Sequence, residues 1–394
     1  MDDLQICHLA IQKVQSCPLS YCKFLTANDT GLTGGHQSGI YVSKVAIKIL
    51  FESPGIRGEN NDKYVKICWQ DDFTTDSRFI YYGKGTRNEY RITRFNRSFP
   101  FLTQEHTGDL FVLCKNTYED YSAYILSTDE EINTFLDAFG MNPTDTDKII
   151  QKENYSLDLL EKSEMNKFID SLVVDFPSTN IMSNKAQEIY DIVYDRQDYI
   201  IRDPDKIIVD WTRIEYRLFR YLEQVRYNSI ITTGFDSVDE FIEVANIVLN
   251  RRKSRAGKSL ENHLSSIFDI HNIIYASQQK TEGNKKPDFI FPTIKDYHDL
   301  DFSMKNLVFL GAKTTCKDRW RQILNEANRI PVKHLFTLQQ GISPQQLDEM
   351  KSENIILVVP RQYINTYPRE HRDEIWSLKK FVDYILEIEG GKVK

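Results

Sequence analysis

The sequence predicts a two-domain protein with a mostly-β N-terminal half and a C-terminal half of the α/β class. Short runs rich in Tyr, Ile, Val and Phe follow one another from Gly39 to Ser127, as is typical of strands joined by tight connections. In the last third, strand-like and helix-like segments alternate, which favours a central mixed sheet covered by helices. At 394 residues the chain is also longer than one typical domain.

The expected strands of the N-terminal half are KYVKICW, RFIYYG, EYRITRF, DLFVLCK and YSAYILS, separated by polar or glycine-containing joints. The next segment, TDEEINTFLDAF, is expected to form a helix, because Ser127 or Thr128 can cap its N-terminus. Residues 141–167 are polar and show little periodicity, which is typical of a linker. We therefore expect an N-terminal domain over 1–145, a linker over 146–180 and a C-terminal domain over 181–394.

Helical spacing begins after the linker. Apolar residues recur there at intervals of three and four, at Ile207, Trp211, Ile214, Leu218 and Leu222. The segment SVDE has the form of a capping box for the next helix. Further along, DFIFP, NLVFLGAK, HLFTL and NIILVVP are expected as strands, and KSLENHLSSIF, KDRWRQILNEAN and EIWSLKKFVDYIL as helices.

Composition narrows the class of protein. The formal net charge of -7 argues against a protein that coats nucleic acid by bulk electrostatics, so any DNA contact must come from local basic patches. The 6 cysteines form no CxxC pair and no zinc-type spacing with histidine, so we expect reduced thiols. The acidic start MDDLQICHLAIQKV is unlike a signal peptide, and no apolar run is long enough to span a bilayer. We expect a soluble cytoplasmic protein without a membrane partner.

Three side chains near the C-terminal strands suit metal-assisted hydrolysis of a phosphodiester: Asp288, Lys313 and Glu326. Such chemistry needs carboxylates to hold a divalent metal, a cation to polarise the phosphate, and an activated water. Asp288 begins one strand, Lys313 ends the next, and Glu326 lies in the helix expected after it. If the strands are adjacent, Asp288 and Lys313 lie side by side. Taken alone, Lys313 and Glu326 are also typical of surface charges, and this alternative stays open.

The same expected helix carries Lys317, Asp318 and Arg319 on its first turn. Arginine can bond the O6 and N7 of guanine and aspartate can accept from the N4 amine of cytosine, so the trio suits reading a G·C pair. Alternatively, Asp318 offsets the helix macrodipole and the two basic side chains are only solvated. The basic run RRKSRAGK, residues 251–258, suits phosphate contacts that position a duplex without reading it.

A local positive patch is also present in the N-terminal half. Arg87, Arg91, Arg94 and Arg97 lie close together with only Glu89 against them, which is typical of a DNA-facing edge. An alternating strand places Arg87, Glu89 and Arg91 on one face.

Long stretches of both halves resemble the EcoRII-type, or type IIE, restriction endonucleases. The C-terminal resemblance lies in FDSVDEFIEVAN, NRRKSRAGKSLENHL, TEGNKKPDFIFP and KTTCKDRWRQILNEA, and the N-terminal one in TANDTGLTGGHQSGIY and TRNEYRITRF. It implies a B3-like β-barrel that binds effector DNA and a restriction-endonuclease-like α/β/α core of the PD-(D/E)xK type. It also implies a Mg²⁺-dependent homodimer that cuts double-stranded DNA at a short CC/GG-flanked site, CCWGG or CCNGG-like, leaving 5′-phosphates.

The resemblance assigns catalytic roles position by position. Asp288, Lys313 and Glu326 match the family's active site, with Asp288 and Glu326 as the metal ligands, and Glu261 matches a further acidic position near the metal. The general nuclease pattern has an acid two residues before the lysine, where this sequence has Gly311. Glu326 then supplies the second carboxylate.

It also assigns recognition roles. Lys317, Asp318 and Arg319 match the base-reading segment, and Trp211 and Tyr297 are candidates for stacking a flipped central base. Trp211 also lies on the apolar stripe of its own helix, so a place in the core is the alternative. The matching effector positions are His36, Tyr41, Arg78, Arg87, Glu89 and Arg91.

The family resemblance further implies stimulation by a second copy of the site, bound at the N-terminal domain, and a functional link to a cognate DNA methyltransferase in a restriction-modification system. Two other functions fit the same features: a non-catalytic, sequence-specific DNA-binding regulator, and a structure-selective repair nuclease on the same core. Mg²⁺-dependent cleavage excludes the first, and cleavage at discrete sequences of plain duplex DNA excludes the second.

Overall fold

The computed structural model describes residues 4–31, 39–95, 99–117, 119–150, 159–194 and 197–390, and it divides into two compact units. The first unit contains Met1–Asn154 together with Gln339–Glu349 and Asn365–Asp373. The second contains Tyr155–Leu338, Met350–Ile364 and Glu374–Lys394. Two short segments of the C-terminal half therefore belong, by their contacts, to the first unit.

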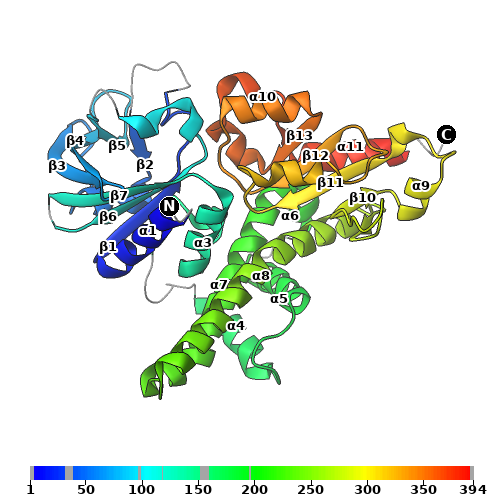
Figure 1. Ribbon diagram of the computed structural model, residues 1–394, viewed down its shortest axis with the longest axis horizontal. Helices are drawn as coiled ribbons and strands as arrows, with labels where there is room; N and C mark the ends of the chain where they lie inside the picture. The colour runs from blue at the N-terminus through cyan, green and yellow to red at the C-terminus, as the bar shows by residue number, and fades with distance from the viewer. Residues whose placement is uncertain are drawn as a thin grey trace. The chain divides into compact units, whose positions relative to one another are not determined.

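The first unit is built on an 8-stranded sheet in the order β2-β5-β4-β3-β7-β6-β1-β8. The strands are β1 (Leu19–Phe24), β2 (Ile40–Val42), β3 (Asn61–Trp69), β4 (Phe73–Tyr82), β5 (Glu89–Thr93), β6 (Leu110–Lys115), β7 (Asp120–Leu126) and β8 (Lys148–Ile149). Neighbours pair antiparallel except β3 with β7, which are parallel. The sheet is strongly curved (Figure 1). The predicted mostly-β character of this half is confirmed.

β1, β6 and β7 are buried on both faces, which explains why β6 and β7 read as near-continuous apolar runs, whereas β3 and the first half of β4 alternate between buried and more exposed residues. Along β6, Phe111 and Leu113 enter one core cluster, whereas Val112 and Cys114 enter the other. The second cluster also includes residues of α1 (Gln5–Ser16) and α3 (Asp129–Phe139). The predicted cap of α3 is confirmed, because the Thr128 side chain accepts from the Glu131 backbone and forms a capping box with it.

Short helices complete this half of the chain: α2 (Ile47–Leu50), η1 (Lys44–Ala46), η2 (Pro100–Leu102), η3 (Gln104–His106) and η4 (Pro143–Asp145).

The second unit contains a 6-stranded mixed sheet in the order β14-β13-β12-β11-β10-β9. Its strands are β9 (Ala276–Ser277), β10 (Phe289–Phe291), β11 (Val308–Lys313), β12 (Lys333–Thr337), β13 (Ile355–Val359) and β14 (Trp376–Ser377). β10 pairs antiparallel with β9 and β11, and the remaining pairs are parallel. The predicted mixed sheet is confirmed.

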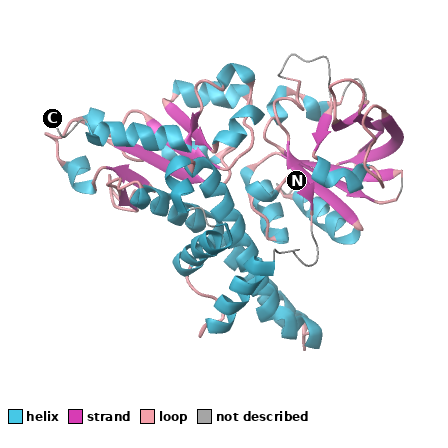
Figure 2. Ribbon diagram, turned by 180° about the vertical axis from the view of Figure 1, so that it is seen from behind, coloured by secondary structure: helices cyan, strands magenta, loops and turns pink. Residues whose placement is uncertain are grey.

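Two long helices dominate this unit, as both ribbon views show (Figures 1 and 2). α7 (Pro204–Thr233) begins at an Asp203 cap, and α8 (Val238–Ile270) begins at Ser237, whose hydroxyl accepts from the Glu240 backbone as SVDE predicts. The other helices of this half are α4 (Leu159–Ser171), α5 (Thr179–Tyr194), α6 (Gln197–Arg202), α9 (Ile294–His298), α10 (Pro344–Ser352), α11 (Leu378–Gly390), η5 (Met304–Asn306), η6 (Arg319–Ile323), η7 (Arg361–Thr366) and η8 (Arg369–His371). No helix in the described ranges has the length and apolarity to cross a membrane.

The prediction of an α-helix over KDRWRQILNEAN is wrong. Only the short 3₁₀ helix η6 forms, and Ala327 beyond it has a φ of 49°, which ends any helical continuation. The backbone here is held by distant residues: the Asn328 N–H donates to Glu282 at 3.1 Å and the Lys333 ammonium donates to the Ala327 carbonyl at 3.2 Å. These tertiary contacts override the local helical spacing.

Candidate functional site

Asp288 and Lys313 meet where β10 and β11 pair. Phe289 lies opposite Leu310 in this antiparallel pair, so Asp288 is brought to the end of β11. The Lys313 ammonium lies 3.3 Å from Asp288 Oδ2, and the Ala312 N–H donates to the same oxygen at 2.8 Å. Asp288 is 8% exposed. The predicted adjacency of these two side chains is confirmed.

Glu326 is the second carboxyl group of the site, and it is presented by the turn after η6 rather than by the helix predicted there. Burial, and after it the negative charge of Asp288, raise the pKa of Glu326 to about 7, against the opposing charges of Lys313, Lys333 and Lys285. The two acids therefore interact electrostatically. A divalent cation relieves this kind of repulsion.

Gly311 stands two residues before Lys313, where the general nuclease pattern has an acid. A Cβ on Gly311 would lie 3.0 Å from the Ile323 side chain, so a carboxylate there would require Ile323 to shift. The acid beside Asp288 and Lys313 is instead Glu326.

The turn that carries Glu326 is held by residues that sequence reasoning did not select. Lys333 is 6% exposed, and its ammonium donates to the carbonyls of Ala327 at 3.2 Å and Ile330 at 3.0 Å. Arg329 donates to the carbonyls of Asp299 at 2.9 Å and Phe302 at 3.1 Å. No local pattern marks these residues, because each acts on backbone that is distant in the sequence or that has an irregular conformation.

Glu261 reaches Asp288 through one further residue that the sequence reasoning missed. From α8, Glu261 Oε2 accepts from Lys258 at 2.9 Å and from the Gln278 amide at 3.2 Å. The same Gln278 Nε2 donates to Asp288 Oδ1 at 2.9 Å. Gln278 therefore joins the α8 carboxylate to the carboxylate at the head of β10.

A divalent cation fits these residues if it takes few protein ligands. In the part of the chain that the structure describes, no three His, Cys, Asp or Glu side chains are grouped closely enough to hold a metal ion. Mg²⁺ is commonly held by one or two carboxylates, with waters and substrate phosphate completing its shell. Burial and the charge of Asp288 both raise the pKa of Glu326, and a bound cation would oppose both effects. Asp288 and Glu326 thus suit such an ion.

The segment Lys317–Arg319 is only partly at the surface. Asp318 and Arg319 are exposed, whereas Lys317 is 6% exposed and burial lowers its pKa to about 7. These residues lead into η6 instead of forming an α-helical first turn, and the Asp318 side chain makes no capping hydrogen bond. Base reading by all three side chains therefore requires Lys317 to leave its buried position.

Trp211 and Tyr297 are both buried, each 1% exposed. Trp211 lies on α7 with its ring centroid 5.7 Å from that of His263, and the Tyr297 hydroxyl bonds to Glu282. Neither ring is presented to a flipped base in this conformation. For Trp211 the structure shows the core position that the apolar stripe predicted as the alternative.

The basic run 251–258 forms part of α8, and its arginines pack within the second unit. Arg252 pairs with Glu223 of α7 at 2.8 Å, and Arg255 is 8% exposed with its guanidinium 4.6 Å from the Phe219 ring centroid. Lys253 and Lys258 are exposed. Within this run, Lys253 and Lys258 are therefore better exposed for the predicted phosphate contacts than Arg252 and Arg255 are.

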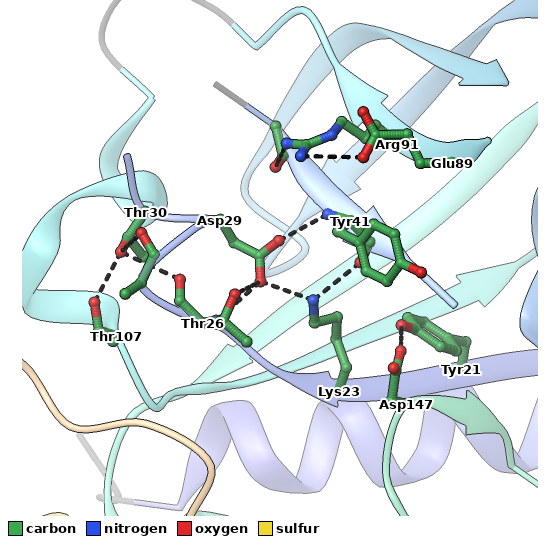
Figure 3. Close-up of polar contacts among 12 residues, drawn as sticks. Tyr21, Lys23, Thr26, Asp29, Thr30, Tyr41, Glu89, Arg91, Thr107 and Asp147 are labelled. Atoms are coloured by element: carbon green, nitrogen blue, oxygen red, sulfur yellow. Dashed lines mark hydrogen bonds and ion pairs between the residues drawn. The ribbon is translucent and has the colours of Figure 1, made fainter. Parts of the chain in front are cut away.

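The described residues that were predicted to bind effector DNA lie on β2, β4 and β5 or in the connection between β4 and β5. Tyr41 pairs with Arg91 across β2 and β5, and Arg91 lies 3.4 Å from Glu89 on the same face of β5 (Figure 3). Arg87 lies over the Tyr82 ring at 5.2 Å, and Arg78 of β4 lies 3.7 Å from Asp62. His36 and Arg97 fall outside the described residues.

Asp29 organises the chain beside these effector residues, and sequence reasoning missed it. It is 1% exposed and accepts from Lys23 at 2.7 Å, from the Thr26 N–H at 2.9 Å and from the Tyr41 N–H at 2.7 Å (Figure 3). It thus ties the backbone before residue 30 to the start of β2. The stretch TAND has residue types that favour such side-chain to backbone bonds, which is the local signal that was available.

Two family models match the chain: EcoRII C terminal over residues 219–382, and Restriction endonuclease EcoRII, N-terminal, over residues 15–143. The Type II restriction enzyme EcoRII of Escherichia coli is 39% identical over 390 residues, covering 92% of this chain and 92% of that protein. The Type II restriction enzyme SsoII of Shigella sonnei is 24% identical over 229 residues, covering 50% of this chain and 74% of that protein.

Solved structures give a weaker likeness. Metal-depleted Ecl18kI in complex with uncleaved DNA has a TM-score of 0.45 at 20% identity, covering 58% of this chain and 83% of that one. A restriction endonuclease PspGI–substrate DNA complex has a TM-score of 0.44 at 16% identity, covering 60% and 98%. Scores this low do not establish a shared fold.

Proposed function

The chain belongs to the EcoRII family of type II restriction endonucleases, and from that premise we propose that it cuts double-stranded DNA at a short CC/GG-flanked site, CCWGG or CCNGG-like. The reaction is a Mg²⁺-dependent hydrolysis that leaves 5′-phosphates. The observation that carries the proposal is the Asp288–Lys313 contact of 3.3 Å at the end of paired strands, with Glu326 electrostatically coupled to both.

Asp288 and Glu326 would hold the ion, which supplies charge neutralisation and an acidified water for attack on phosphorus. Lys313 keeps its ammonium at Asp288, and from there it can donate to a phosphate oxygen of the bound strand. The Ala312 N–H fixes the orientation of the Asp288 carboxylate. Glu326 must give up its proton before it can act as a ligand, because its pKa of about 7 leaves it partly protonated at neutral pH.

For recognition, we assign the G·C pairs of the site to Asp318 and Arg319, whose exposed side chains offer an acceptor and a bidentate donor. Lys317 also contacts the bases once DNA binding has exposed its buried side chain. The B3-like first unit would bind a second copy of the site. Its proposed contacts are His36, Tyr41, Arg78, Arg87, Glu89 and Arg91. Binding of this second DNA copy to the first unit stimulates cleavage. When no second copy is bound, the first unit inhibits cleavage.

We further propose that the active species is a homodimer, because a palindromic site suits a two-fold symmetric protein. Apolar side chains exposed near the junction of α7 and α8 support association: Ile231, Val238, Phe241, Ile242 and Ile247 are 69%, 72%, 51%, 48% and 44% exposed. A cell that carries this activity also needs a cognate methyltransferase to protect its own DNA. The enzyme would act in the cytoplasm, as part of a restriction-modification system.

Digestion of a fully sequenced plasmid with Mg²⁺, followed by sequencing of every end, tests this function. Discrete 5′-phosphate ends at CC/GG-flanked sites are expected from the wild type and from Lys305→Ala, a control at an exposed lysine. They should vanish in Lys313→Ala. Binding without cutting, in several metals and with added site-containing duplex, would instead identify a regulator. Cutting only at branched or damaged DNA would identify a repair nuclease.

A further inference from the structure

We propose that Gln278 is a third protein ligand of the catalytic metal and supplies its side-chain amide oxygen to the ion. The proposal rests on the metal-dependent cleavage proposed above and adds a residue that neither the sequence motifs nor the family resemblance selects. Its basis is the position of the Gln278 side chain between the carboxylates of Asp288 and Glu261.

The Gln278 amide occupies the space that separates Asp288 from Glu261. Its Nε2 donates to Asp288 Oδ1 at 2.9 Å and to Glu261 Oε2 at 3.2 Å. The other Asp288 oxygen, Oδ2, is taken by the Ala312 N–H and by Lys313. The Asp288 oxygen that remains for an ion is therefore the one that Gln278 holds.

The backbone of Gln278 is locked at this position. Its N–H is shared between the carbonyls of Pro287, at 3.1 Å, and Asp288, at 3.4 Å, and the preceding residue Ser277 pairs with Phe289. Its φ is 55°, in the left-handed region that non-glycine residues seldom adopt. Such conformations persist where surrounding contacts enforce them, and they cluster at functional sites. The Gln278 side chain thus starts from a fixed backbone position beside Pro287 and Asp288.

An amide can serve both states of such a site. Without a cation, its NH₂ group gives each of the two carboxylates a hydrogen-bond donor. With a cation, half a turn about the last side-chain bond presents Oε1, a neutral hard oxygen of the kind that Mg²⁺ and Ca²⁺ accept. The described residues hold no group of three His, Cys, Asp or Glu side chains that could hold an ion, so an oxygen from Gln278 would add a neutral ligand to the two carboxylates.

Two substitutions separate ligation from mere positioning. Gln278→Ala removes the oxygen and the NH₂ group together, whereas Gln278→Glu keeps an oxygen and removes the ability to donate. If Gln278 acts only by donating to Asp288 and Glu261, both variants lose metal affinity. If it is a ligand, Gln278→Glu binds the ion at least as tightly as the wild type does.

The test is titration of the full-length proteins with Mn²⁺, with free Mn²⁺ followed by electron paramagnetic resonance. We expect Gln278→Ala to weaken Mn²⁺ binding about tenfold or more, Gln278→Glu to retain or tighten it, and Gln279→Ala, at the exposed neighbouring glutamine, to match the wild type. Thermal melting without metal checks that each variant is folded. If Gln278→Ala does not fold, Gln278→Met replaces it as a side chain of similar length without the amide.

Unchanged Mn²⁺ affinity in Gln278→Ala would overturn the proposal, and so would an equal loss in Gln278→Ala and Gln278→Glu. Cleavage of plasmid DNA by the wild type is measured in parallel. A wild type that cuts and binds Mn²⁺, with a Gln278→Ala variant of unchanged affinity, refutes only the ligand role. A wild type that neither binds Mn²⁺ nor cuts refutes the proposed function and the ligand role together.

Discussion

Each compact unit contains a lysine–aspartate pair with a further carboxyl group nearby, and the two pairs differ in how that carboxyl group is held. Asp147 of the first unit accepts a hydrogen bond from the Tyr21 hydroxyl at 2.5 Å, and burial and the charge of Asp29 raise its pKa. Lys23 and Asp29 of the first unit lie 2.7 Å apart, are 3% and 1% exposed, and share further bonds with Thr26 and Tyr41 (Figure 3). Asp288 and Lys313 of the second unit lie 3.3 Å apart, and burial together with the charge of Asp288 raises the pKa of the nearby Glu326 to about 7.

The difference separates a structural ion pair from a reactive one. A buried pair whose bonds are all made fixes a conformation, and breaking it leaves an uncompensated charge. A pair with an unmatched carboxyl beside it has affinity left for a cation and for the phosphate that the cation draws in. Residue type alone does not separate these cases, because both are a lysine next to an aspartate.

The largest expected effect is on catalysis. Lys313→Ala should lower single-turnover cleavage by about a thousandfold or more, because the cation at the phosphate is lost, while the melting temperature changes little. Lys305→Ala is the matched control. A variant that cuts within about tenfold of the wild-type rate would remove Lys313 from the proposed mechanism.

The next effect is on stability and belongs to the other pair. Asp29→Ala should cost about 3–5 kcal/mol, because it leaves the Lys23 ammonium buried without its carboxylate. Chemical denaturation followed by tryptophan fluorescence measures the loss. Asp288→Ala should cost clearly less, since its removal also relieves Glu326. Equal costs for the two substitutions would break the distinction drawn between the pairs.

A smaller effect depends on pH. The pKa of Glu326 is raised from 4.5 to about 7, so the folded state favours the protonated acid and loses stability as pH rises from below 4.5 through 7. Glu326→Gln should therefore raise the melting temperature of the metal-free protein at pH 8, on the order of 1–3 kcal/mol in stability, with little gain at pH 4.5. Melting curves across this range with EDTA check the sign. A gain that is equal at both pH values would show that the ionisation of Glu326 is not the cause.

The smallest expected effect is on DNA binding by the first unit. Glu89→Ala should weaken binding of a site-containing duplex to a cleavage-deficient Lys313→Ala protein by about 1–3 kcal/mol, because a base acceptor is lost. It should also reduce stimulation by added duplex in the otherwise wild-type enzyme. Glu119→Ala changes an exposed acid of the same unit and serves as the control. Unaltered stimulation in Glu89→Ala would exclude this residue from the effector site.

Local pattern predicted much of the fold and part of the candidate site. The five strand runs of the first unit coincide with β3 to β7, and the caps of α3 and α8 form where Thr128 and Ser237 place them. The contact between Asp288 and Lys313 also followed, because strands that are consecutive in the sequence usually lie next to each other in a sheet. The helix over KDRWRQILNEAN did not form, since Glu282 and Lys333 bind its backbone from outside the segment.

What the sequence by itself determined are the strands β3 to β7 and β10 to β13, the N-terminal caps of α3 and α8, the meeting of Asp288 with Lys313, and membership of the EcoRII family. Each depends on residues within one element, on neighbouring elements, or on long matching stretches. Only the tertiary structure decided that Gln278 bridges Glu261 and Asp288, that Lys333 holds the turn bearing Glu326, and that Trp211 and Lys317 are buried. These outcomes depend on which parts of the chain pack together in the folded protein, and the spacing of residues along the sequence does not reveal that.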